Sequence, residues 1–396
     1  MSQYSVRAEW EPLSAVRVHT PGVELWSGSL APEANLFEAH VPPEQARREH
    51  EALVEVLAES HVEVHRLADD LAGDALDDLT RSVLAEGGVD RIDDVLASFD
   101  AREKLAVVLS RPRLAAETAA GGTDGASVTL EAPISNIYFQ RDTTIVGDEG
   151  PILCHMSEPI RQREVPIVRR AWEAIGATFS HEMTGEPLEG GEFIPAGEFA
   201  LLGVSAEVDG EEHVIRTSYE AGERLMRHGA VSYDEFGLVR APLEADRRLR
   251  QDRGLGSRVM HLLGWFNIAA EGLAVLDADL AETAAVDIYR LRGGAYEHSH
   301  TTSVLEYVRD ERGFDVIDVA DGERWPTNFL AIDDGVVIPL YEPDADGGYQ
   351  PTNNPTIEAL RDHGVTVRPD GIGIPRAALT NGAGGLHCMT TPISRG

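Results

Sequence analysis

The sequence of 396 residues predicts an α/β protein built from repeated units, each a β-hairpin followed by a helix and a further strand. Short apolar runs that flank a turn recur along the chain, and helical patterns lie between them. The hydrophobic fraction of 42% is enough for a large core. A doubly wound sheet is the alternative, but it has longer single strands between helices, and hairpins recur often here.

The N-terminal segment predicts a strand, a helix and a second strand. Residues 15–19 form the first strand pattern, which Pro21-Gly22 closes. A helix follows, opened by Pro42-Pro43, with Leu53, Val54 and Leu57 on one face. Residues 62–67 then alternate as a strand.

Residues 68–125 differ from the repeat and predict an inserted helical subdomain within a single domain that spans 1–396. Leucine and valine recur there at helical spacing among Asp and Glu, as at Leu76, Leu79 and Val83. The glycine-rich composition of residues 119–127 predicts a flexible loop at its end.

The remaining chain predicts four further hairpins. Their ranges are 142–156, 192–205, 261–276 and 329–341. The Asp334-Gly335 pair in the last is a strong hairpin turn signal. Helices are expected at 161–175, 217–227 and 355–362. We expect residues 388–394 to pair with the N-terminal strand and close a ring.

The charge excludes one class of partner. The chain has 68 acidic and 34 basic residues, a net charge of −34, and Lys104 is its single lysine. A nucleic-acid partner is therefore not expected, because phosphates would be repelled. Two explanations fit the acidity: a surface adapted to a high-salt cytoplasm, or a GC-rich genome that favours arginine over lysine.

We expect a cytoplasmic protein without a membrane partner. No run of 18 apolar residues is present, and the first residues lack the pattern of a signal peptide. Cys154 and Cys388 are accordingly expected as free thiols. The sequence leaves the oligomeric state open, a homo-oligomer included.

Four chemically active residues stand near the starts of the predicted units: Asp142, Glu189, His261 and Cys388. In a ring of repeated units, equivalent positions converge on one axis, so these four predict a nucleophilic site. Each alone has a structural explanation, since a free cysteine is commonly a small buried hydrophobe and a histidine can lie in the core. Only their joint presence favours catalysis.

Four motifs resemble those of arginine deiminases, in the same order and at similar spacing. NIYFQRD at 136–142 resembles their NLYFTRD, LEGGE at 188–192 their LEGGD, MHL at 260–262 the start of their MHLD, and GGLHCMT at 384–390 their GGGHCMT. The resemblance implies the fold of the guanidino-group-modifying (amidinotransferase) superfamily, a five-module β/α propeller (pentein), here with a helical insertion. It also implies a hydrolase that acts on C–N bonds of linear amidines and needs no cofactor.

The resemblance also implies the catalytic roles. Cys388 would attack the central carbon of a small-molecule guanidino substrate and form a covalent thiouronium intermediate. His261 would protonate the departing nitrogen and then activate water. Asp142 would accept hydrogen bonds from the guanidinium, and Glu189 would support His261 and the substrate nitrogens.

Asn136, Arg161 and Arg216 match positions that hold the amino-acid end of the substrate. Two positions depart from the family pattern. Leu263 stands where an aspartate follows the catalytic histidine, and Ala383 stands where an arginine precedes the cysteine. We therefore expect Leu263 to contribute an apolar wall to the substrate site, which disfavours free arginine.

Two other functions stay open at this point: an amidinotransferase, which passes the amidino group to an amine, and a binding homologue without catalysis. No metal site is predicted. His298 and His300 are spaced like a ligand pair in a polar loop, but no third ligand accompanies them.

Overall fold

Five sheets repeat one pattern in the part of the chain that the structure describes. Two strands pair antiparallel, a helix follows, and a third strand pairs parallel to the second. The repeated ββαβ units expected from the sequence are therefore present, in place of a doubly wound sheet. The computed structural model describes residues 3–118, 124–130, 133–254 and 256–396.

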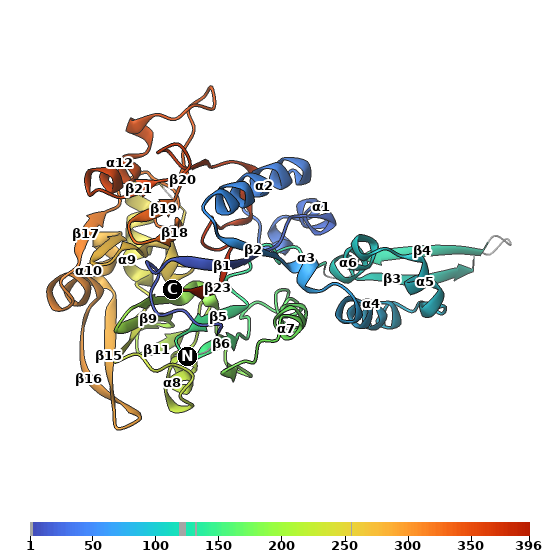
Figure 1. Ribbon diagram of the computed structural model, residues 1–396, viewed down its shortest axis with the longest axis horizontal. Helices are drawn as coiled ribbons and strands as arrows, with labels where there is room; N and C mark the ends of the chain where they lie inside the picture. Colours follow the sequence, from blue (N-terminus) through green and yellow to red (C-terminus); the bar gives the residue numbers. More distant parts are fainter. Residues whose placement is uncertain (1–2, 119–123, 131–132, 255) are drawn as a thin grey trace.

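The first of these sheets joins the two ends of the chain. Strand β1 (Leu13–Val18) lies between β23 (Thr391–Arg395), its antiparallel neighbour, and β2 (Glu63–Arg66), its parallel neighbour. Helix α2 (Pro43–Glu59) connects β1 to β2. The expected pairing of the C-terminal segment with the N-terminal strand is confirmed, and Figure 1 shows the two strands side by side.

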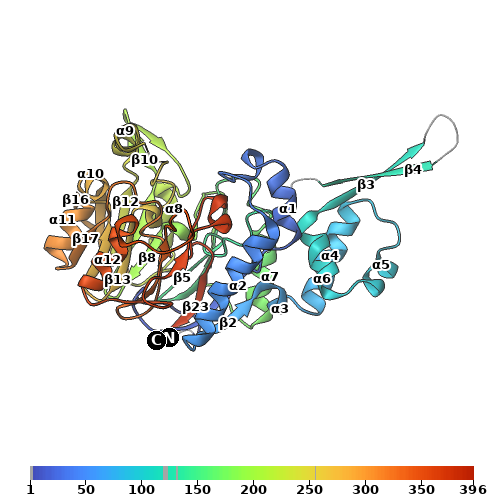
Figure 2. The ribbon, with the colours of Figure 1, turned by 90° about the horizontal axis from the view of Figure 1, so that it is seen from above.

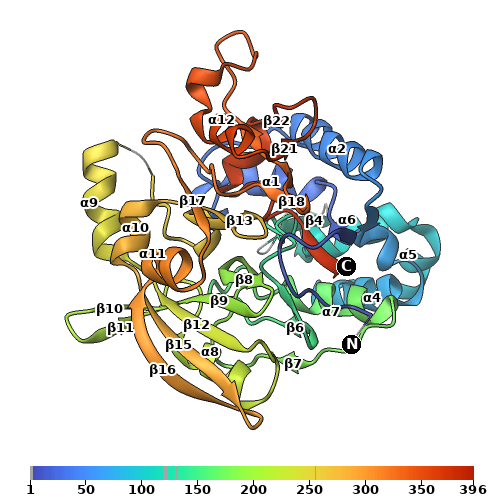
Figure 3. The same cartoon turned by 60° about the vertical axis from the view of Figure 1, so that its left-hand side comes forward.

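The other four sheets begin at the four hairpins that the sequence predicts. The hairpins and their third strands are β5 (Thr144–Gly147), β6 (Gly150–Leu153) and β7 (His181–Glu182); β8 (Phe193–Ala196), β9 (Phe199–Val204) and β12 (Glu235–Arg240); β13 (Phe266–Ala270), β14 (Leu273–Leu276) and β17 (Asp315–Asp318); and β18 (Leu330–Asp333), β19 (Val336–Ile338) and β21 (Thr366–Val367). Figure 3 shows these hairpins and β23 arranged around the middle of the main body.

The crossover helices pack on these sheets through apolar faces. In α2, which begins at Pro43, the buried side chains of Leu53 and Leu57 pack with Val16 and Val18 of β1. Proline suits the first turn of a helix because its missing N–H has no acceptor there. The equivalent helices of the other units are α7 (Val165–Ala174), α8 (Tyr219–Arg227), α10 (Ala278–Thr283) with α11 (Val304–Glu306), and α12 (Pro355–Asp362).

The segment predicted as a helical insertion contains helices and a hairpin. Its helices are α3 (Leu67–Asp70), α4 (Asp74–Glu86), α5 (Ile92–Ser98) and α6 (Ala101–Ser110). Strands β3 (Pro112–Thr118) and β4 (Asp124–Leu130) follow and pair antiparallel, so the helical expectation was wrong for these residues. Residues 119–123 of the predicted flexible loop lie outside the described residues, and 124–127 are strand. Figure 2 shows the hairpin projecting beyond the helices.

The third sheet is larger than the sequence predicted, because β15 (Ala285–Arg292) and β16 (Ala295–Ser303) extend its edge. His298 and His300 therefore lie on a strand and not in a polar loop. The remaining elements are α1 (Val23–Leu30), α9 (Leu243–Arg253), β10 (Ala206–Val208) with β11 (Glu211–His213), and β20 (Leu340–Tyr341) with β22 (Ile374–Pro375). Among the described residues, no helix is both long and apolar enough to cross a bilayer.

Candidate active site

One polar or nucleophilic residue precedes the first strand of each of the five repeated sheets. The separation from the strand is two to five residues, so the five side chains occupy corresponding places in the repeat. They are Asp142 before β5, Glu189 before β8, His261 before β13, Asn328 before β18 and Cys388 before β23. Four of these residues were expected from the sequence. Asn328 was missed, although its place before the fourth predicted hairpin was a signal that could have identified it.

The thiol of Cys388 is buried and held by Asn328. The Asn328 side-chain Nδ2 donates to Sγ at 3.1 Å, and its Oδ1 accepts from the backbone N–H groups of His387 and Cys388 at 3.0 and 3.3 Å. Gly385 permits this contact, since a Cβ at that position would lie 2.7 Å from Oδ1. Burial raises the pKa of Cys388 to about 11, with Asp142 adding to the rise, so the resting thiol is protonated at neutral pH.

A buried charged network supports the loop that carries the thiol. Arg141 donates its backbone N–H to the carbonyl of Cys388 at 3.0 Å, and its Nη2 donates to Nε2 of His387 at 2.8 Å. Glu9 lies 3.3 Å from His387 Nε2 and accepts from Arg395 at 3.0 Å. Burial, together with the cation of Arg141, lowers the pKa of His387 to about 4, which keeps its ring neutral. The network therefore joins the N-terminus, β23 and the cysteine loop.

His261 is buried and paired with Glu189. Its Nε2 lies 2.9 Å from Glu189 Oε2, while Oε1 of the same carboxylate accepts from the N–H and the hydroxyl of Ser157, both at 2.9 Å. Burial lowers the pKa of His261, but the charge of Asp142 and the Glu189 hydrogen bond outweigh it and raise the pKa above its ordinary value. Burial raises the pKa of Glu189, but the hydrogen bond to His261 acts in the opposite direction, and the net result is a pKa lowered to about 2. Both shifts favour the pair of an imidazolium and a carboxylate.

Asp142 completes the negative side of the site. Its Oδ1 lies 3.9 Å from His261 Nδ1, and its Oδ2 accepts from Arg161 Nη1 at 2.6 Å. Gly191 lets these groups approach, because a Cβ there would meet Nδ1 at 2.7 Å and Oδ1 at 2.9 Å. Arg161 is further bound to both oxygens of Glu164, at 3.0 and 2.9 Å. The guanidinium of Arg161 thus already occupies one oxygen of Asp142.

These residues surround a small cavity that holds about 30 Å³, room for one or two water molecules. Its wall includes Asn136, Arg161 and Arg216, which the sequence predicted for the substrate's far end. The lining residues are Leu36, Asn136, Phe139, Asp142, Arg161, Arg216, Met260, His261, Gly382, Ala383 and Cys388. Glu189 lies behind His261 and does not line the cavity.

Three buried polar atoms around the cavity have no hydrogen-bond partner among the described residues: Asp142 Oδ1, His261 Nδ1 and Arg216 Nε. Buried polar atoms normally have partners, so their joint presence marks a place for a polar ligand. Asp142 Oδ1 is a hydrogen-bond acceptor, His261 Nδ1 can exchange a proton, and Arg216 Nε is a hydrogen-bond donor. A guanidinium at one end and an anion at the other would satisfy the acceptor and the donor.

Leu263 is not where the sequence led us to expect it. Its side chain is fully buried in an apolar cluster that includes Ile194 and Phe266, and it is absent from the cavity wall. Helix residues 262–264 turn it toward this core while His261 faces the site. The expectation that Leu263 forms an apolar wall of the substrate site was therefore wrong. The apolar side chains that line the cavity are those of Leu36, Phe139 and Met260.

The sequence predicted no metal site, and the structure adds one observation to that expectation. Ligand atoms of Asp142, Glu189 and His261 all lie within 4.8 Å of one another. Two of these groups are carboxylates, and Oδ1 of Asp142 has no hydrogen-bond partner among the described residues. A cationic guanidinium suits this cluster, as a metal ion does.

The site brings together a cysteine thiol, a histidine paired with a carboxylate, and a second carboxylate, a combination typical of enzymes with a cysteine nucleophile. The family model for arginine deiminase matches residues 102–395. The arginine deiminase of Halobacterium salinarum is 34% identical, over 98% of this chain and 96% of its own length. That of Bacillus cytotoxicus is 27% identical and covers 98% of both chains.

The chain belongs to the arginine deiminase family and is a hydrolase that acts on carbon–nitrogen bonds. Solved structures share its α/β fold at low identity. The amidinotransferase SxtG of Microseira wollei superimposes with a TM-score of 0.54 at 15% identity, over 99% of this chain and 97% of its own. DDAH of Pseudomonas aeruginosa, solved with citrulline, gives 0.53 at 14% identity, over 96% and 98%. The resemblance read from the four motifs is thereby confirmed.

Proposed function

We propose that the chain deiminates a substrate with a guanidinium at one end and a carboxylate at the other, L-arginine first among them. The observation that carries this proposal is the set of three unpartnered buried atoms around the cavity beside Cys388. Arg216 in the same wall has a buried Nε donor without a partner among the described residues, so a substrate with an anionic group would give that donor an acceptor. The related enzymes named arginine deiminase support the same substrate class.

The first half-reaction begins with the guanidinium against Asp142 Oδ1 and the thiol. A cation beside Sγ favours the thiolate, which offsets the raised pKa of Cys388, and the thiol proton passes to solvent before the attack. Sulfur then attacks the central carbon, and the C–S bond forms. His261 is protonated and gives a proton from Nδ1 to the departing nitrogen, so ammonia leaves as the C–N bond breaks. The product of this step is a thiouronium on Cys388.

The second half-reaction returns the proton. His261, now neutral, takes a proton from a water molecule, and the oxygen attacks the thiouronium carbon. The C–S bond breaks, the hydroxyl proton of the intermediate passes to the departing thiolate, and the ureido product is released. The sum is one guanidino group and one water converted into one ureido group and one ammonia. Glu189 keeps the imidazole oriented through both steps, because its own second oxygen is fixed by Ser157.

Asn136, Arg161 and Arg216 bind the end of the substrate that carries the carboxylate. Arg216 has an unused Nε donor, and Arg161 has to leave Asp142 Oδ2 before that carboxylate can accept both substrate nitrogens. An incoming carboxylate offers Arg161 a replacement partner. The cavity of about 30 Å³ must widen for this exchange.

We propose further that residues 1–396 form one catalytic domain, a five-module β/α propeller with the insertion at 68–125. The support is the repeat itself: five sheets with one strand pattern, and five site residues at corresponding places in them. Equivalent positions of a ring converge on its axis, which accounts for how residues from 142 to 388 meet at one cavity.

The test is a substrate panel scored for ammonia and for ureido product: L-arginine, an N-methylated arginine, agmatine and guanidinoacetate. Agmatine lacks the carboxylate, so it should be at least about ten-fold poorer in kcat/KM than arginine, the value of one charge-assisted contact. Equal use of agmatine would contradict the role of the two arginines. Transfer of the amidino group to an added amine, with no ammonia, would show an amidinotransferase instead.

A further inference from the structure

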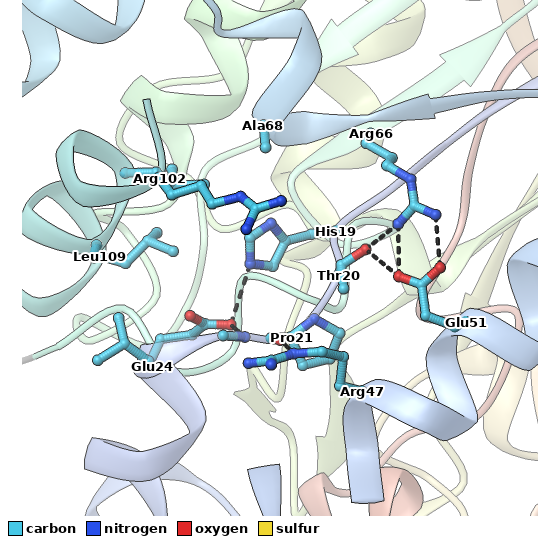
Figure 4. Close-up of a pocket in the computed structure, with 14 residues that line it drawn as sticks. His19, Thr20, Pro21, Glu24, Arg47, Glu51, Arg66, Ala68, Arg102 and Leu109 are labelled. Atoms are coloured by element: carbon cyan, nitrogen blue, oxygen red, sulfur yellow. Dashed lines mark hydrogen bonds and ion pairs between the residues drawn. The ribbon is translucent and has the colours of Figure 1, made fainter. Parts of the chain in front are cut away.

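A large cavity lies away from the catalytic residues, between α1, α2 and helix α6 of the insertion. It holds about 560 Å³ and shares no lining residue with the catalytic cavity. This volume is within the range of sites for small organic ligands. Figure 4 shows its wall, to which three arginines contribute: Arg47, Arg66 and Arg102.

The three arginines differ in how far they are already paired. Arg66 binds both oxygens of Glu51, at 2.8 and 2.7 Å. Arg47 has one contact, a donation to the carbonyl of Pro21 at 3.2 Å. Arg102 has no hydrogen bond or ion pair with any other described residue. Two guanidinium groups in the wall are therefore without a carboxylate partner, in a chain whose acidic residues outnumber its basic ones two to one.

The floor of the cavity contains a buried polar pair. His19 is 2% and Glu24 is 0% exposed, and His19 Nε2 lies 3.1 Å from Glu24 Oε1. The other ring nitrogen, Nδ1, and the other carboxylate oxygen, Oε2, have no partner among the described residues. In Figure 4 the ring of His19 lies between Glu24 and the guanidinium of Arg102. Unpartnered polar atoms at this depth are uncommon, and a hydrogen-bond donor elsewhere on a bound ligand would give them a partner.

Part of the wall is apolar. Leu105, Ala106 and Leu109 of α6 line the cavity together with Pro21 and Val23. A ligand that fills the space therefore needs an apolar body as well as a charged group. The wall has three arginines against Glu24 and Glu51, so its net charge is positive although that of the whole chain is −34. Both features select an organic anion.

We propose that this cavity binds a small organic anion through its carboxylate or phosphate group, with Arg47 and Arg102 as the ligands of that group. The site is additional to the catalytic function. Arg102 comes from the insertion and Arg47 from α2, so the anion would tie the insertion to the main body. Planar guanidinium groups suit both kinds of oxyanion.

An anion bound in this cavity would affect the catalytic cavity through the segment that follows α1. Glu24 is on α1, and the chain continues to Asn35 and Leu36. The carbonyl of Asn35 accepts from Asn136 Nδ2 at 2.8 Å, and Leu36 and Asn136 both line the catalytic cavity. We therefore expect a bound anion to change KM for the guanidino substrate, because Asn136 belongs to the substrate-binding wall.

The test is calorimetric titration of the full chain with inorganic phosphate, succinate and adenosine monophosphate, each at one fixed ionic strength set with KCl. We expect saturable binding of at least one probe, and a loss of about ten-fold or more in affinity in Arg102→Ala, the scale of a charge-assisted hydrogen bond. Arg47→Ala is the second variant, and Arg91→Ala is the matched control, an insertion arginine with an 82% exposed side chain outside the cavity.

The probes separate the sources of the oxyanion: binding of succinate alone identifies a carboxylate site, and binding of phosphate or the nucleotide a phosphate site. Absence of saturable binding by all three probes would overturn the proposal. So would binding that Arg102→Ala and Arg47→Ala leave unchanged, or that Arg91→Ala weakens equally.

Discussion

At the scale of single residues, the state of His261 decides the pH dependence of the reaction. Its raised pKa favours the imidazolium, and the departing nitrogen needs that proton. The alkaline limb of kcat should therefore lie above the ordinary histidine pKa of about 6.5. Because the Glu189 hydrogen bond raises the pKa of His261, Glu189→Gln should move this limb to lower pH, by about one unit or more.

The measurement is kcat across pH for the wild type and Glu189→Gln, with Glu198→Gln as the control at a carboxylate whose side chain is 75% exposed. A limb that stays in place in Glu189→Gln would show that the pair does not set the proton affinity of His261.

Asn328 is the residue that holds the thiol, and its removal should affect the chemistry more than binding. The variant Asn328→Ala loses the donor to Sγ and the acceptor for two backbone N–H groups. We expect kcat to fall by about ten- to one-hundred-fold with little change in KM, since hydrogen bonds to a charged sulfur are worth about 1.5–3 kcal/mol.

Loss of the Asn328 donor should also raise the thiol pKa. Alkylation of Cys388 by iodoacetamide, followed across pH, should therefore shift to higher pH in Asn328→Ala, while Asn353→Ala, an exposed asparagine, should match the wild type. Reduced melting temperature with an unshifted alkylation profile would show a purely structural role.

Leu263 shows what a motif comparison alone cannot settle. The missing aspartate was apparent from the sequence, but the direction of the replacing side chain was not, because it depends on the turn at 262–264 and on the core behind it. Asn328 is the opposite case, because its place before the fourth predicted hairpin corresponds to the places of the other site residues and could have identified it from the sequence.

At the scale of elements, the approach of the Gly190–Glu192 turn to His261 depends on the absence of a side chain. A Cβ at Gly191 would lie 2.7 Å from His261 Nδ1 and 2.9 Å from Asp142 Oδ1, closer than atoms pack. We expect Gly191→Ala to lose at least about 100-fold in kcat/KM, the low end for acid–base catalysis, because both groups must move.

The control for Gly191→Ala is Gly256→Ala, where a Cβ meets nothing within 4 Å. Circular dichroism should show both variants folded. An active Gly191→Ala enzyme would mean that the turn adjusts without displacing His261.

The hairpins of the repeat were predictable because each has a local signal, a turn between two apolar runs. The β3–β4 hairpin and the β15–β16 extension were not. Arg113 and Glu117 are charged residues in β3, and β16 is mostly exposed, so neither segment has the apolar alternation by which a half-buried strand is recognised. Their strand state comes from pairing with a neighbour.

At the scale of the whole molecule, the net charge of −34 should make stability depend on salt. The screening length falls from about 30 Å at 0.01 M to about 3 Å at 1 M, which removes most of the repulsion between carboxylates. We expect the melting temperature to rise steeply between these limits, in KCl as in NaCl. A melting temperature independent of salt would favour genome composition as the origin of the arginine-rich, lysine-poor sequence.

The whole-molecule account has one central claim: Cys388, at the closing sheet of the repeat, forms a covalent intermediate with a guanidino substrate. The most direct measurement is peptide mass spectrometry of wild-type enzyme quenched in acid during turnover of L-arginine. Cys154 is an internal control, because it is 1% exposed and outside the cavity wall. The account predicts an adduct with the mass of arginine less ammonia on the peptide that contains Cys388, and none in Cys388→Ser. An adduct on Cys154, or full turnover by Cys388→Ala, would contradict it.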